Sequence, residues 1–200
     1  MYKNLNIEKI GNIIYYLADQ VTGINITKAL KLLYIIDETS VKESGVPVTF
    51  LNYSVWQYGP VAEEVYDDLR HKSPFDQPLR KYVSTEEKIN PDTANYECLL
   101  LPNSDHTFSD DELSDYEVEL VDRIIKEYGS KSATQLVRLL HDNGTLWHTI
   151  VIREELKKYF EMYGGRSKNV IEFSDLVEDD PIKKLAMKAA YESLNFQLTL

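Results

Sequence analysis

Apolar positions recur at helical spacing near the N-terminus and again after a glycine. The first run follows Asn6, which can cap a helix ahead of an apolar stripe. The second run follows Gly23, with Thr27 as the expected cap, and it ends before Gly45 and Pro47. The sequence therefore predicts two amphipathic helices joined by a short turn.

Asp37 lies on or at the edge of the apolar stripe of the second helix. It follows Leu33, Tyr34 and Ile36, so its carboxylate must be exposed, paired or hydrogen-bonded. We favour an internal anchor for Asp37. Contact with a partner is the second interpretation, and catalysis is the least favoured.

Gly59 and Pro60 precede a further apolar spacing. Proline is tolerated at the first helical position, where its missing N–H has no partner to lose. Val61, Val65 and Leu69 then give one inner face. The pattern predicts that Gly59-Pro60 forms the cap and the first position of a third helix.

Three segments have the β-branched, aromatic or apolar composition of extended chain. They are residues 48–56, 80–85 and 96–101. The last two flank Asn90-Pro91-Asp92, a strong turn signal. A small antiparallel hairpin beside the helices is therefore expected.

The second half of the chain is also mainly helical by pattern. Ser114 and Glu117 form a capping box, and Gly129 ends that helix. Further elements are expected as helices from Ser132 to His141 and from 153 to 163, an extended piece at 170–173, and a last helix that starts at Pro181, capped by Asp180. The predicted fold is mainly α with a small antiparallel β element (α+β): one compact helical domain over 1–150, with a helical C-terminal extension over 151–200 packed on it.

Composition narrows the classes of function. The chain has 200 residues with a net charge of −11, which disfavours binding to a phosphate backbone. Its one cysteine, Cys98, cannot form an internal bridge and is expected to be a small core residue. The first twenty residues mix charges with apolar positions, so we expect no signal peptide and no membrane span. A cytoplasmic protein is predicted, with no nucleic-acid or membrane partner.

Known catalytic motifs do not occur in the sequence. It has no phosphate-binding glycine loop, no serine elbow and no paired histidines around a glutamate. His141 and His148 are seven residues apart, but Gly144 interrupts any shared helix. Trp56 and Trp147 are expected to be core residues first. We therefore predict no catalytic residue, no metal and no cofactor.

Two ordered blocks of residues carry a family resemblance. The first is Lys31-Leu32-Leu33-Tyr34-Ile35-Ile36-Asp37, Gly45 and Pro47, then Trp56-Gln57-Tyr58-Gly59-Pro60-Val61 with Val65-Tyr66 and Leu69. The second is Tyr128-Gly129, Ser132-Ala133, Leu136, His141 and Trp147. Over about residues 10–150 the chain resembles the Panacea domain of the SocA-like antitoxins, because both blocks occur in the right order and at the right separation.

The resemblance implies a non-enzymatic antitoxin that neutralises a co-encoded toxin by direct contact. It implies a cognate toxin as partner and, if the chain acts as a proteolytic adaptor, a ClpXP-type protease. The candidate partner-binding or family-motif residues are Leu33, Tyr34, Asp37, Trp56, Tyr58, Gly59, Pro60, Val61, His141 and Trp147. The resemblance leaves their individual roles open.

Two other functions remain open from the sequence. One is a bacterial interaction or adaptor protein that is associated with a phage or a mobile element and has no toxin partner. The other is a hydrolase that uses Asp37 and His141, which fall in different blocks and could meet in space.

Overall fold

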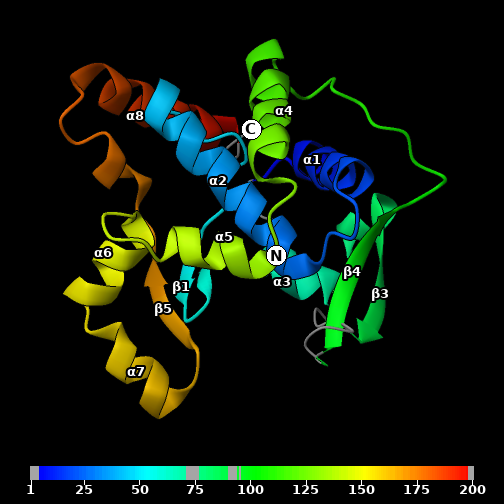
Figure 1. The fold of residues 1–200 in the computed structure, drawn as a ribbon. Coiled ribbons are helices and arrows are strands. Elements are labelled where there is room, and N and C mark those ends of the chain that lie inside the picture. The colour runs from blue at the N-terminus through cyan, green and yellow to red at the C-terminus, as the bar shows by residue number, and fades with distance from the viewer. Residues whose placement is uncertain (1–4, 71–76, 90–93, 95, 198–200) are drawn as a thin grey trace.

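The long helix α2 lies at the centre of the fold, with most other elements packed on it (Figure 1). The computed structural model describes residues 5–70, 77–89, 94 and 96–197. The α-helices are α1 (Ile7–Gln20), α2 (Ile26–Ser44), α3 (Glu63–Leu69), α4 (Asp115–Tyr128), α5 (Ala133–Leu140), α6 (Leu146–Arg153), α7 (Leu156–Tyr163) and α8 (Pro181–Gln197). The strands and 3-10 turns are β1 (Ser54–Trp56), β2 (Gly59–Val61), η1 (Pro78–Lys81), β3 (Val83–Ile89), β4 (Tyr96–Pro102), β5 (Arg166–Val170) and η2 (Phe173–Leu176).

Helix α2 is buried on nearly all sides. It contacts α1, α3, α4, α5 and α8, so its apolar residues form the middle of the core. Its N-cap is Asn25, whose side chain accepts a hydrogen bond from the Lys28 amide. The prediction that Thr27 is the cap is wrong, because Asn25 has the extended backbone of a cap and Thr27 already lies in the first turn. Gly45 ends the helix in the left-handed conformation, as predicted.

The strands form two small antiparallel sheets. One has the order β2-β1-β5, and the other is the hairpin β3-β4. The hairpin was predicted from the sequence, although the predicted turn at residues 90–92 lies outside the described residues. With eight α-helices in the described parts of the chain, the predicted mainly helical α+β class is confirmed.

The prediction for Gly59-Pro60 is wrong. Gly59 to Val61 is strand β2, in which Pro60 pairs with Val55 of β1. Helix α3 starts only at Glu63. The extended segment predicted over 48–56 is likewise a strand only at Ser54–Trp56.

The C-terminal region differs from its prediction in two places. The helix expected over 153–163 is present as α7 but begins only at Leu156, because Glu155 has a φ of +50° and separates it from α6. The strand there is β5 at 166–170 rather than 170–173, and it pairs with β1. Helix α8 begins at Pro181 with Asp180 accepting hydrogen bonds from the Ile182 and Lys183 amides, as predicted. The domain boundary near residue 150 stays a prediction.

Candidate functional site

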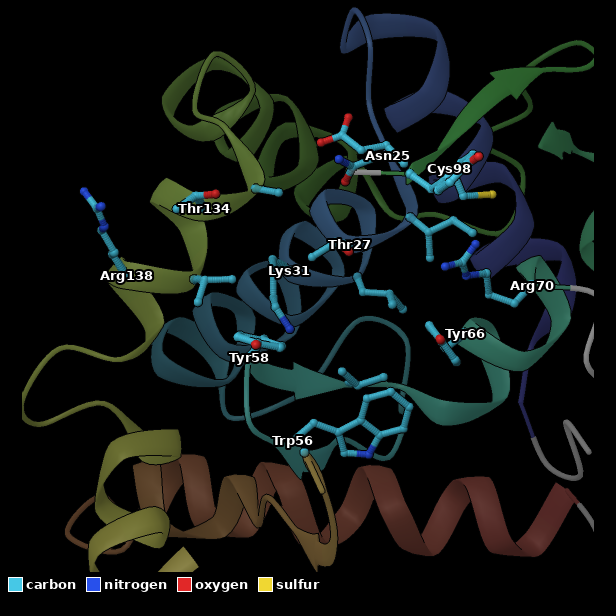
Figure 2. A pocket seen from close by; sticks show the side chains of 18 residues that line it. Asn25, Thr27, Lys31, Trp56, Tyr58, Tyr66, Arg70, Cys98, Thr134 and Arg138 are labelled. Atoms are coloured by element: carbon cyan, nitrogen blue, oxygen red, sulfur yellow. The ribbon is translucent and has the colours of Figure 1, made fainter. Parts of the chain in front are cut away.

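A pocket lies between α2, the β1-β2 hairpin, α3, β4 and α5 (Figure 2). Its volume of about 670 Å³ is in the range of ligand-binding pockets. The lining residues central to the site are Lys31, Trp56, Tyr58, Val61, Tyr66 and Arg70. We call it the Lys31 pocket. It brings together Lys31 of the second predicted helix and Trp56, which are more than twenty residues apart in the chain.

Lys31 is 1% exposed and projects from α2 towards the β1-β2 hairpin (Figure 2). Its Nζ donates a 2.7 Å hydrogen bond to the carbonyl oxygen of Pro60. Among the described residues, no carboxylate forms an ion pair with it. Burial without a counter-charge lowers the pKa of Lys31 to about 7. The ammonium is therefore present in only part of the molecules near neutral pH.

Gly59 leaves the space that the Lys31 side chain fills. A Cβ at this position would lie 3.2 Å from both Cε and Nζ of Lys31. The residue also has a φ of +98°, which L side chains rarely adopt. The pair Gly59-Pro60 thus provides a close approach of backbone to a buried lysine, instead of a helix start.

Aromatic side chains form one wall of the Lys31 pocket. Trp56 and Tyr66 pack edge to face, with ring centroids 5.1 Å apart. The Arg166 guanidinium from β5 lies 4.1 Å from the Trp56 ring centroid, within cation–π range. Tyr58, in the β1-β2 turn, is 66% exposed at the edge of the pocket. This edge therefore offers an accessible aromatic surface.

Leu33, Tyr34 and Asp37 lie in the core and away from this pocket. All three are fully buried. Asp37 accepts hydrogen bonds from the Thr49 amide at 2.8 Å, from the Thr49 hydroxyl and from the Tyr53 hydroxyl at 2.7 Å. Burial raises the pKa of Asp37 to about 6, although these hydrogen bonds oppose the shift. The contacts join the middle of α2 to the segment that leads into β1.

His141 and Trp147 form a second cluster behind the β1-β2 hairpin. Their rings stack with centroids 3.7 Å apart, and the Trp147 Nε1 donates a 2.8 Å hydrogen bond to the carbonyl oxygen of Trp56. Burial, assisted by the nearby charge of Lys31, lowers the pKa of His141 to about 4. The pair thus packs the start of α6 against the strand that carries Trp56.

The predicted site residues therefore separate into groups. Trp56, Tyr58 and Val61 line the Lys31 pocket, whereas Asp37 and His141 have separate sets of partners in the described structure. Sequence reasoning missed Lys31 as a site residue. A signal was present, because Lys31 precedes the buried Tyr34 by one helical turn and so lies on the buried face.

Within the described ranges, no three His, Cys, Asp or Glu side chains are grouped as metal ligands would be. None of the helices in those ranges has the length and apolar character needed to cross a bilayer. Cys98 is a buried free thiol on β4.

Comparison with known proteins gives one family. Neither a search of curated proteins nor a search of solved structures found a match. The family model described as "Antitoxin SocA-like, Panacea domain" matches residues 30–148. The match includes every candidate residue discussed above, from Leu33 to Trp147. The chain therefore belongs to the SocA-like antitoxin family, which is defined by the Panacea domain.

Proposed function

We propose that this protein neutralises a co-encoded toxin by binding it directly, without catalysis. The observation that carries the proposal is the family match over residues 30–148, which includes most of α2, both sheets except β5, and the His141-Trp147 cluster. A binding role also fits Asp37, because its carboxylate is fully buried and held by Thr49 and Tyr53. A group held in this way has no access to a substrate.

The toxin is proposed to contact the edge of the Lys31 pocket through Tyr58. Tyrosine and tryptophan are enriched among residues that contribute most of the binding energy at interfaces. Tyr58 is 66% exposed and lies in the two-residue turn between β1 and β2. Trp147 and Lys31 each donate a hydrogen bond to a backbone carbonyl of the hairpin, at Trp56 and at Pro60. The turn that carries Tyr58 is therefore fixed in place before a partner binds.

Charge supports a basic partner surface outside the pocket. The net charge of −11 gives the protein a negative field, which speeds the approach of a positively charged toxin. The rate of association is therefore expected to fall as salt is added. The equilibrium affinity depends more on packed contacts such as those of Tyr58.

The test is co-expression with the toxin encoded by the neighbouring gene. The proposal predicts growth rescue and co-purification of the two proteins, both weakened by Tyr58→Ala. Tyr163→Ala is a matched control, because Tyr163 is 71% exposed on α7 and lies outside the family segment. Equal loss in the two variants would contradict the proposed surface.

The mode of neutralisation has its own control. The same rescue is measured in a strain that lacks the ClpXP protease. Direct neutralisation predicts undiminished rescue there. Rescue that requires the protease would overturn neutralisation by binding alone and would identify the protein as a proteolytic adaptor.

A further inference from the structure

The Lys31 pocket is basic, whereas the protein is acidic. Its lining includes Lys31, Arg70 and Arg138 but a single acid, Glu97. Over the whole chain, 33 acidic residues exceed 22 basic ones. Figure 2 shows the Arg70 guanidinium directed into the pocket, whereas Arg138 extends away from it. The pocket is thus a local positive region that attracts an anion.

Lys31 has hydrogen-bonding capacity left at the inner end of this pocket. An ammonium group has three N–H donors, and the structure shows one acceptor, the Pro60 carbonyl oxygen. A buried ammonium is costly unless an opposite charge reaches it. A methionine would fill the same space without that cost and would lose only the hydrogen bond to Pro60. Packing and this one bond leave two N–H groups of Lys31 unexplained, and a ligand accounts for them.

We propose that the Lys31 pocket binds the carboxylate of an organic ligand, with the ligand's flat apolar part against Trp56 and Tyr66. The two remaining N–H groups of Lys31 match the two oxygens of a carboxylate. Ile26, Leu30, Val61 and Val137 add apolar surface to the lining, which suits an aromatic or aliphatic body.

Arg70 supplies positive charge without holding the ligand rigidly. Its Nη1 lies 3.6 Å from the Glu87 carboxylate, so its charge is partly compensated. Lys31 is the one fully buried cation in the lining, and its single charge matches that of a carboxylate better than the two charges that a phosphate can carry. These features favour a carboxylate over a phosphate.

The carboxylate could come from a free metabolite or from the end of a polypeptide chain. Both sources present the same chemistry to Lys31, and the probes distinguish them. Phenylacetate represents the free ligand, and acetyl-Gly-Gly-Phe with a free C-terminus represents the chain end. The matching amides, phenylacetamide and the amidated peptide, keep the shape and remove the charge.

The readout is the titration of Lys31 by NMR in the full-length protein with labelled lysines. A ligand that binds the charged form must raise the pKa of Lys31 from about 7 towards its ordinary 10.5. We expect phenylacetate or the peptide acid to do so and to shift the amide signals of Trp56 and Tyr58. The amides should do neither.

Variants give an independent measurement. Lys31→Met should weaken binding of the acid probe by more than about tenfold, the factor that corresponds to losing one charge-assisted hydrogen bond. Lys158→Met is the control, because Lys158 is an exposed lysine on α7. The comparison of acid with amide uses the parent protein alone, so it stands even where Lys31→Met fails to fold.

Three outcomes would overturn the inference. In the first, acids and amides bind alike, or neither acid shifts Lys31 at millimolar concentration. In the second, inorganic phosphate displaces the acid probe at lower concentration than acetate does, which would identify a phosphate site. In the third, Lys31→Met folds and still binds the acid as the parent does. Each result leaves toxin neutralisation to be judged separately, because growth rescue does not enter this test.

Discussion

The imidazole ring of His141 lies flat on the indole ring of Trp147, with 3.7 Å between centroids and 1° between planes. The indole is 5% exposed, and its Nε1 reaches the backbone of Trp56. The contact joins the end of α5 to the start of α6 and both to β1. His141 and Trp147, from the second block of family residues, thus support strand β1, which carries Trp56 of the first block.

Trp147→Ala is expected to lower the free energy of unfolding by about 3–5 kcal/mol, because it leaves a cavity behind β1. Urea denaturation followed by circular dichroism measures this loss. Trp147→Phe keeps a stacking ring but loses the hydrogen bond to Trp56 and part of the packing. It should therefore cost less than the alanine variant, with about 1 kcal/mol of the loss due to the hydrogen bond. An alanine variant as stable as the parent but unable to neutralise would make Trp147 a contact residue instead.

The Asp37 carboxylate should give stability a recognisable pH dependence. Its pKa is raised from 3.8 to about 6, so the folded state favours the protonated form in that window. Below the unfolded pKa of 3.8, Asp37 makes its whole contribution to the free energy of unfolding. This contribution, about 3 kcal/mol, is lost as the pH rises through the folded pKa. In Asp37→Asn, which cannot ionise, this contribution is absent.

The difference in stability between parent and Asp37→Asn isolates that effect from other carboxylates. The amide presents donors to Thr49 and Tyr53, so the variant should be the less stable protein near about pH 4, by about 1–3 kcal/mol. The gap should narrow as the pH rises to about 7. A gap that stays constant over this range would refute the raised pKa of Asp37.

Gly59→Ala should destabilise the protein more than Gly144→Ala. Both glycines have positive φ, +98° and +88°, so both variants carry backbone strain of about 1–2 kcal/mol. A Cβ at 59 also meets Lys31 at 3.2 Å, whereas nothing lies within 4 Å at 144. Crowding should therefore lower the free energy of unfolding by a further amount of about 1–3 kcal/mol in Gly59→Ala only. Equal decreases in melting temperature for the two variants would argue against this crowding.

Alanine substitutions can show whether Asn25 or Thr27 caps α2. Asn25→Ala removes the side-chain acceptor for the Lys28 amide and should cost about 1 kcal/mol. Thr27→Ala should change the free energy of unfolding by less than about 0.5 kcal/mol, because Thr27 lies inside the first turn. The opposite ranking would restore Thr27 as the cap.

Local signals in the sequence predicted the elements that depend on near neighbours. The capping boxes of Ser114 with Glu117 and of Ser132 with Gln135 are present, and they begin α4 and α5. Such signals work because donor and acceptor lie within one helical turn. The fold class and most helix positions could therefore be read from the chain alone.

Distant contacts account for the errors. Pro60 is in a strand because β1 pairs with it and Lys31, 29 residues earlier, binds its carbonyl oxygen. Strand β5 pairs with β1, and Ser167 of β5 binds Val55 of β1 across 112 residues of chain. No local pattern could reveal this pairing. The pocket was missed for the same reason, because its lining residues come from helices and strands that are far apart in the chain.

The most direct measurement of the central claim is a titration of the purified protein against the toxin of the neighbouring gene in a cell-free activity assay. Binding predicts that protection increases in proportion to the protein added and saturates near equal amounts, in parent and Asp37→Asn alike where the variant is folded. A catalyst would protect at far lower amounts, because each molecule would inactivate many toxin molecules. Protection that is complete far below equal amounts and is abolished by Asp37→Asn would contradict neutralisation by direct binding.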